Sequence, residues 1–200
     1  MNIAAISRLP LALLLSGLSL GFLAPEAAAF DAPRPEAPKV RARAFLKTDK
    51  LPAGGRSAVA VVLDIQPGWH VNSNPAPTKY AVPTTVTVTT SRGTQIGEFT
   101  FPTLPPETPG GPRRPVKELK GRVVLRAPIR VPVGAAGGDE RLTVSVKYQA
   151  CDATRCLRPK TLTFGGMLPV AAPGDPVRLA NAEWFHGSAG PADAPRTAER

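Results

Sequence analysis

The chain has 200 residues, of which 42% are hydrophobic and 20% are charged, which suits one domain of ordinary size. Its 24 Pro and 18 Gly argue against a helical bundle and favour short strands joined by turns. The net charge is +10, but the basic residues form no long run, so we expect no nucleic-acid binding. Two Cys and two His exclude a four-cysteine zinc site, and we expect neither a metal nor an organic cofactor.

Residues 1–29 have the features of a secretory signal peptide. Arg8 precedes a mostly apolar run over 9–23, and small residues lead up to Ala29. The run is shorter than the roughly 20 residues that a spanning helix needs, which leaves an uncleaved anchor as the alternative. We expect cleavage after Ala29, export to an oxidising compartment, and no stable membrane insertion of the mature chain. In that oxidising compartment the two cysteines can form a disulfide that persists.

The mature chain begins with a Pro-rich lead-in over 30–39. Period-two alternation of apolar and polar residues then predicts strands over 40–46, 57–65, 82–90, 142–148 and 161–164, with one or two more within 116–133. The stretch 99–115 holds six Pro and two Gly, so we expect a long irregular loop there.

These elements predict an all-β fold, an immunoglobulin-like β-sandwich over residues 40–168 with irregular Pro/Gly-rich loops. No convincing amphipathic helix interrupts the strand candidates. Residues 169–200 are rich in Ala, Pro and Gly, and we expect a loosely ordered tail there, with Trp184 and Phe185 as the residues that would dock on the sandwich.

The two cysteines, Cys151 and Cys156, lie between two strand candidates with four residues between them, a length typical of a hairpin loop. We therefore expect a disulfide. Closing a loop of about six residues stabilises by roughly 2 kcal/mol, against roughly 4 or more for a long loop. The disulfide would therefore contribute little to stability. Arg155 beside it would favour the thiolate form of a reduced cysteine. Both a structural and a redox-active disulfide remain open on spacing alone.

Residues 148–159 (YQACDATRCLRP) resemble the Y-Q-x-C…C-x-x-P segment of the N-terminal domain of the thiol:disulfide interchange protein DsbD family. Two further blocks are similar to that family and follow its order: 68–75 (GWHVNSNP) with 82–84 (VPT), and 116–121 (VKELKG) with 131–132 (VP). The resemblance spans most of the mature chain.

The resemblance implies a periplasmic immunoglobulin-like domain whose cysteine pair relays electrons, as a protein-disulfide reductase or electron carrier. Cys156 would form the mixed disulfide with partners and Cys151 would resolve it. The donor would be a thioredoxin-like or membrane electron-transfer protein, and the acceptor a periplasmic disulfide protein. Tyr148, Asp152 and Arg155 are candidates for tuning the thiols; the alternative places Tyr148 in the core and the other two in an exposed turn.

Three differences from the family qualify this prediction. Full-length members continue into a membrane domain and a thioredoxin-like domain, so a relay here would need separately encoded partners. Some members shield their cysteines with an aromatic residue of a cap loop, whereas 105–115 contains no aromatic residue. Four residues separate the cysteines here, and five do in some members.

Two other interpretations remain. The chain could be a non-catalytic binding or adaptor module in which the disulfide only holds the hairpin. A metal site made of His70 and the cysteine pair is a minor alternative, since His70 more simply begins a strand or packs beneath a loop.

Overall fold

The computed structural model describes residues 37–104, 114–115 and 117–185. The predicted signal peptide, residues 30–36 of the lead-in, residues 105–113 of the predicted irregular loop and residues 186–200 of the predicted tail lie outside these ranges. Across the described part of the chain, no helix is long and apolar enough to cross a membrane.

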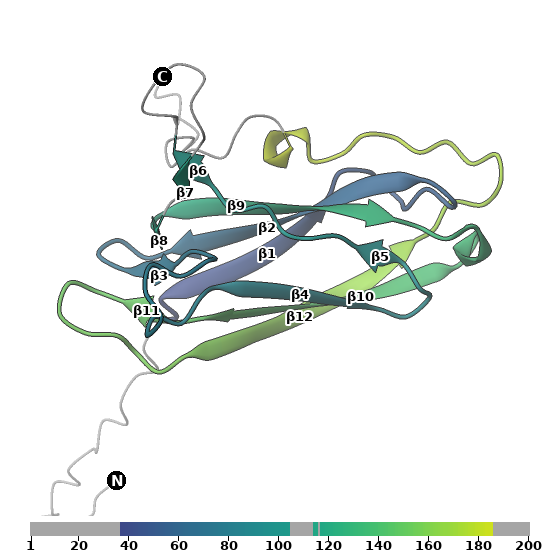
Figure 1. Ribbon diagram of the computed structural model, residues 1–200. Coiled ribbons are helices and arrows are strands. Elements are labelled where there is room, and N and C mark those ends of the chain that lie inside the picture. Colours follow the sequence, from purple (N-terminus) through teal and green to yellow (C-terminus); the bar gives the residue numbers. More distant parts are fainter. Residues whose placement is uncertain (1–36, 105–113, 116, 186–200) are drawn as a thin grey trace, which may run out of the picture. The chain divides into compact units, whose positions relative to one another are not determined.

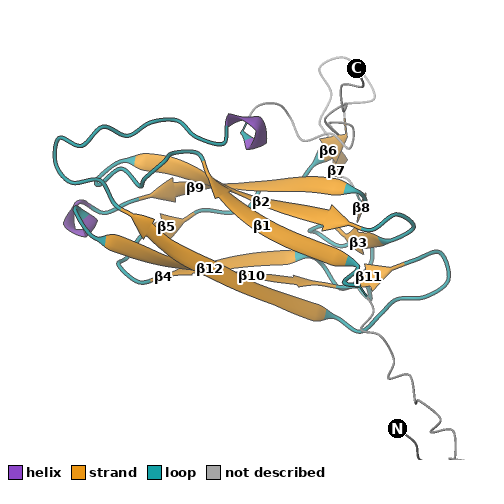
Figure 2. Ribbon diagram, turned by 180° about the vertical axis from the view of Figure 1, so that it is seen from behind, coloured by secondary structure: helices purple, strands orange, loops and turns teal. Residues whose placement is uncertain are grey.

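Two antiparallel sheets form the two layers of a sandwich, as Figures 1 and 2 show. The four-stranded sheet has the order β1 (Val40–Leu46), β2 (Arg56–Ile65), β9 (Arg122–Arg130) and β5 (Gln95–Ile96). The three-stranded sheet has the order β12 (Lys160–Pro169), β10 (Asp139–Tyr148) and β4 (Thr85–Thr90). The predicted all-β, immunoglobulin-like sandwich is confirmed.

Short strands complete the fold. A three-stranded ladder at one end of the sandwich has the order β11 (Ala150–Cys151), β3 (His70–Asn72) and β8 (Glu118–Leu119). A separate pair joins β6 (Thr103–Leu104) to β7 (Arg114–Pro115), and two short 3₁₀ helices are η1 (Val133–Ala135) and η2 (Ala182–Trp184). The short ladder carries the disulfide, because β11 ends in a cysteine.

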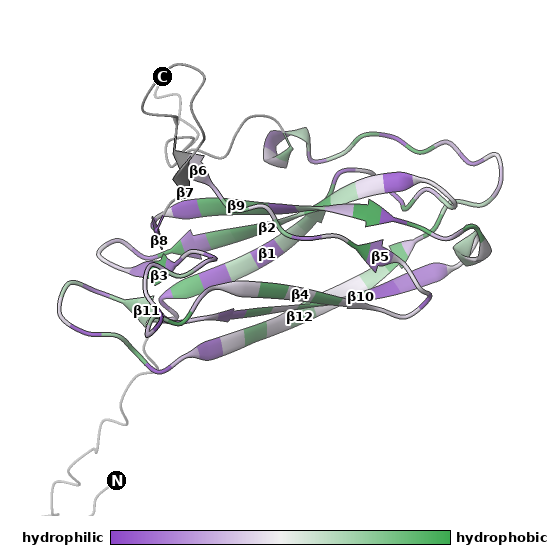
Figure 3. Ribbon diagram, in the orientation of Figure 1, coloured by the Kyte–Doolittle hydropathy of each residue, from purple (hydrophilic) through white to green (hydrophobic). Residues whose placement is uncertain are grey.

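The core lies between the two layers and follows from the alternation of the strands. In β2, Val61 and Leu63 are fully buried, and in β10 Val144 and Val146 are buried opposite them in the same cluster. Figure 3 shows hydrophobic bands alternating with polar or pale ones along β9 and β12. Burial of these apolar side chains supplies the main driving force for folding at about 25 cal/mol per Å².

Two strands are longer and one is shorter than the alternation predicts, and the first of these, β10, begins at Asp139 rather than at residue 142. β12 continues beyond residue 164 to Pro169, because Gly165 and Gly166 pair with Thr143 and Leu142 of β10 despite their low strand propensity. β4 begins at Thr85 rather than at residue 82, since the residues before it instead connect to β3: the Thr84 N–H donates to the Asn72 carbonyl.

Residues 169–185 of the predicted loosely ordered tail make specific contacts with the sandwich. The Ala171 N–H donates to the Leu51 carbonyl, and Val170 and Ala171 are buried. Further along, Trp184 stacks on Phe45 with ring centroids 5.0 Å apart, as its predicted docking requires. The composition conceals these contacts because they are backbone bridges and isolated ring contacts, which need no periodic pattern.

Candidate functional site

The short β11–β3–β8 ladder sorts its side chains onto two faces. Directly paired residues of antiparallel strands share a face, and the face alternates along each strand. The face toward the core carries three apolar residues that are almost fully buried: Ala150, Val71 and Leu119. The opposite face carries a sulfur atom and three polar side chains: Cys151, His70, Asn72 and Glu118.

A disulfide joins Cys151 to Cys156 with an S–S distance of 2.01 Å, and the two residues also form a β-bridge. The two cysteines differ in their access to solvent. Cys151 is buried, with 4% of its surface exposed, whereas Cys156 is exposed to solvent. Cys156 is therefore the cysteine that solvent reaches, and Cys151 lies behind it.

Asp152 organises the turn between the two cysteines. Its Oδ1 atom accepts hydrogen bonds from the Thr154 N–H and hydroxyl and from the Arg155 N–H, at 2.8, 2.9 and 2.8 Å. The same bonds, with that of the Thr154 N–H the strongest, hold the pKa of Asp152 below its ordinary value. The carboxylate thus stays ionised and keeps the tip of the hairpin folded.

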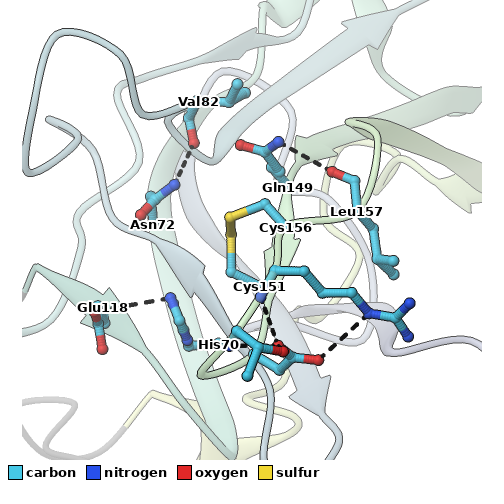
Figure 4. Close-up of a disulfide and its surroundings, with 11 residues drawn as sticks. His70, Asn72, Val82, Glu118, Gln149, Cys151, Cys156 and Leu157 are labelled. Carbon is cyan, nitrogen blue, oxygen red and sulfur yellow. Dashed lines mark hydrogen bonds and ion pairs between the residues drawn. A yellow bond between two sulfur atoms is a disulfide. The ribbon is translucent and has the colours of Figure 1, made fainter.

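Two further hydrogen bonds join the arms of the hairpin independently of the sulfur atoms. The Leu157 N–H donates to the Ala150 carbonyl at 2.8 Å, and the Gln149 Nε2 group donates to the Leu157 carbonyl at 3.0 Å. Figure 4 shows Gln149 and Leu157 beside the disulfide. These bonds remain available whether the cysteines are oxidised or reduced.

The three residues considered for thiol tuning occupy two environments. Tyr148 is 3% exposed and packs in the main core cluster, where burial raises the pKa of its hydroxyl. Asp152 and Arg155 lie in the turn, and the Arg155 Nε atom is 3.7 Å from the Asp152 carboxylate. A tuning role for the three stays a prediction, and so does the catalytic role of the cysteines.

The sequence predicts no role at this site for Asn72 or Glu118, and for His70 it favours a strand or packing position over the minor alternative of a metal ligand. His70 Nε2 lies 3.8 Å from Glu118 Oε1, and Asn72 donates to the Val82 carbonyl at 3.1 Å. Figure 4 shows these residues around the disulfide. The available signal was the polar–apolar–polar alternation of residues 70–72 inside one of the family-like blocks.

A cavity of about 480 Å³ opens beside the hairpin, and its lining includes Trp69, His70, Glu118 and Asp152. It gives small solutes a path to the imidazole. Within residues 37–104, 114–115 and 117–185, no group of three or more His, Cys, Asp or Glu side chains is arranged to hold a metal ion.

The fold and the site define an immunoglobulin-like β-sandwich that carries a hairpin disulfide at one end. Residues 40–166 match the family model described as thiol:disulfide interchange protein DsbD, N-terminal. The chain belongs to this family of thiol–disulfide exchange domains, as the resemblance in its cysteine segment predicted.

Solved structures resemble the chain only distantly. The N-terminal periplasmic domain of ScsB from Proteus mirabilis matches with 16% identity and a TM-score of 0.42, over 72% of this chain and 52% of that one. The yeast GGA1 GAE domain matches with 12% identity and a TM-score of 0.36, over 67% and 95%. The chain thus spans about half of the ScsB structure. A search of curated proteins found no match.

Proposed function

We propose that the protein is a periplasmic thiol–disulfide exchange protein that relays electrons to protein disulfides through Cys151 and Cys156. One observation supports this most: in a member of the DsbD N-terminal family, the hairpin disulfide presents an exposed Cys156 and a buried Cys151. The donor is a thioredoxin-like or membrane electron-transfer protein, and the acceptor is a periplasmic protein disulfide.

In the first half of the cycle, a thiolate of the reduced donor attacks the Cys156 sulfur. The Cys151–Cys156 bond breaks, and Cys151 leaves as a thiolate that takes up a proton. The second donor thiol then loses its proton and attacks the donor sulfur of the mixed disulfide, which releases the Cys156 thiolate. Two electrons have passed to the pair, and the donor has become a disulfide.

In the second half, the Cys156 thiolate attacks the acceptor disulfide, and one acceptor sulfur leaves as a thiolate. Cys151 loses its proton and attacks the Cys156 sulfur, which breaks the mixed disulfide. The acceptor leaves as a dithiol after protonation, and the Cys151–Cys156 bond is restored. Neither half requires a metal or an organic cofactor.

The hairpin suits a bond that opens and closes repeatedly. The disulfide closes a loop of about six residues and so contributes only about 2 kcal/mol to stability. The Asp152 turn and the bond from the Leu157 N–H to the Ala150 carbonyl hold the two arms together without it. The two sulfur atoms therefore stay adjacent after reduction.

The reduction potential of the Cys151–Cys156 bond tests this function. The protein is equilibrated in graded thiol–disulfide buffers, and alkylated thiols are counted by mass. We expect a potential between about −120 and −270 mV, the range of proteins that exchange disulfides. A potential well below about −300 mV would mark a structural disulfide and favour the binding or adaptor module.

We also propose that residues 1–29 are a cleaved signal peptide and that residues 40–168 form the exchange domain. The apolar run over 9–23 and the small residues before residue 30 support cleavage after Ala29. N-terminal sequencing of the protein from a periplasmic extract should begin at Phe30, and an intact Met1 in the membrane fraction would contradict export by cleavage.

A further inference from the structure

His70 lies directly across the short ladder from the buried cysteine of the pair. Cys151 and His70 are Cα partners in the antiparallel pairing of β11 and β3, so their side chains leave the ladder on the same face. Side chains in such a position have Cβ atoms about 5 Å apart. Figure 4 shows the imidazole between Glu118 and Cys151.

The buried position of Cys151 creates a need for a proton acceptor. Cys151 is 4% exposed, and water therefore has little access to it. Burial disfavours the thiolate, yet only the thiolate can attack the Cys156 sulfur and resolve a mixed disulfide. A base beside Cys151 that becomes positively charged as the thiolate forms would offset this cost.

Charged side chains lie close to His70. Glu118 Oε1 lies 3.8 Å from His70 Nε2, and the pKa of Glu118 is held below its ordinary value, first by its hydrogen bond to Lys120 and further by His70. Lys120 Nζ lies 2.8 Å from the other Glu118 oxygen, and Asp152, with Arg155 3.7 Å away, lines the same cavity as His70. Glu118 is thus the carboxylate that faces the imidazole directly, and Lys120 and Asp152 line the same cavity.

We propose that His70 is the proton acceptor for Cys151 when the mixed disulfide is resolved, and that Glu118 positions it. The proton moves from the Cys151 sulfur to the imidazole, the Cys151 thiolate forms the bond to Cys156, and the partner sulfur leaves with the electron pair. In the reverse direction the imidazolium returns the proton to the departing Cys151 thiolate. This inference rests on the proposed exchange function.

An aryl disulfide probe, dithiobis-nitrobenzoate, separates the two cysteine steps in one stopped-flow trace. The fully reduced protein releases one coloured thiolate when Cys156 attacks the probe. A second coloured thiolate is released when Cys151 attacks the resulting mixed disulfide. The first phase reports Cys156, and the second phase reports Cys151, each as a function of pH.

Removal of the imidazole should affect the second phase alone. We expect His70→Gln to slow the second release about tenfold or more near neutral pH and to move its pH dependence upward. The first phase should stay within about twofold of the wild-type rate, since Cys156 is exposed. Added imidazole, which can enter through the adjoining cavity, should restore part of the second rate.

Two further variants separate chemistry from structure. Glu118→Gln should move the pH dependence of the second phase in the same direction by a smaller amount, because the imidazolium loses its partner. Asn72→Ser alters the same strand and the same face but removes no titrating group, so its pH dependence should match the wild type. If His70→Gln fails to fold, the Glu118→Gln result decides.

The outcomes distinguish the inference from the function on which it rests. If the second phase of His70→Gln keeps the wild-type rate and pH dependence, the role of His70 is overturned and the exchange function stays intact. The same holds for Glu118→Gln where that variant decides. A wild-type protein that releases only one coloured thiolate would overturn the relay itself, because Cys151 would then not resolve.

Discussion

At each end of the sandwich a carboxylate holds a turn by accepting hydrogen bonds, but the two carboxylates differ in burial. Where β10 begins, beside η1, Glu140 is fully buried and accepts hydrogen bonds from the N–H groups of Ser91 and Arg92 and the hydroxyl of Thr94, at 2.6, 2.9 and 2.6 Å. Beyond the other end of β10, Asp152 holds the disulfide hairpin by a similar set of bonds, but its side chain is 24% exposed. Figure 1 shows η1 and β11 at these opposite ends.

Glu140 and Asp152 differ in solvent access and therefore in how much each contributes to the stability of its turn. A buried carboxylate whose two oxygens both accept hydrogen bonds fixes a turn strongly, because its removal leaves donors unpaired in a dry environment. A partly exposed carboxylate stabilises a turn less, because water can replace its bonds. We therefore expect Glu140 to contribute more to stability than Asp152, whereas the Cys151–Cys156 end is the more open to solvent.

The largest expected effect is loss of exchange when either cysteine is removed. Cys151→Ser and Cys156→Ser should each abolish turnover with a reduced thioredoxin-like donor, while the free energy of unfolding falls by only about 2 kcal/mol. Mixed with an oxidised acceptor alone, Cys151→Ser should also accumulate the mixed disulfide between Cys156 and the acceptor, because the resolving thiol is absent. Mass spectrometry of quenched reactions and denaturant unfolding measure the two effects.

Glu140→Ala should produce the opposite pattern. It leaves the N–H groups of Ser91 and Arg92 unpaired, so we expect a loss of about 3 kcal/mol of unfolding free energy with an unchanged reduction potential. The exposed Glu98 provides the matched control, and Glu98→Ala should stay within about 0.5 kcal/mol of wild type. A potential that moves with Glu140→Ala would show that the two ends are not independent.

Local patterns in the sequence predict the strands better than the site. The alternation over residues 40–46 and 57–65 matches β1 and β2 because apolar side chains recur at every second position of each strand, and core residues such as Val40, Val61 and Leu63 are among them. His70, Glu118 and Cys151 meet only through the register of three strands that are two or three residues long. Such short strands carry almost no periodic signal, and their pairing depends on residues far apart in the chain.

Acid should weaken the Glu140 end first. Burial alone would raise the pKa of Glu140, but its hydrogen bonds from Thr94, Arg92 and Ser91 outweigh burial and hold the pKa below its ordinary value. A depressed carboxyl pKa contributes stability that is complete above the unfolded pKa of about 4.3 and is lost as pH falls through the folded value. Unfolding free energy measured from about pH 6 to pH 3 should therefore fall more steeply in wild type than in Glu140→Gln. Parallel curves would contradict this.

Replacing Asp152 should give the smallest effect and separates its shape from its charge. In Asp152→Asn the amide oxygen can still accept from the Thr154 and Arg155 N–H groups, so we expect an unchanged reduction potential and a Cys156 reaction rate within about twofold of wild type. Asp152→Ala removes these bonds, loosens the reduced hairpin and makes closure of the disulfide less favourable. Its potential should move upward by on the order of 10 mV.

The two Asp152 variants decide which property of the carboxylate matters at the disulfide end. If Asp152→Asn shifts the reaction as much as Asp152→Ala does, the negative charge acts on the thiols directly, and the predicted tuning role is correct. If only Asp152→Ala shifts it, Asp152 acts by holding the turn, as Glu140 does at the other end. The second outcome would leave the charge effects on Cys151 to His70 and Glu118, which share its face of the ladder.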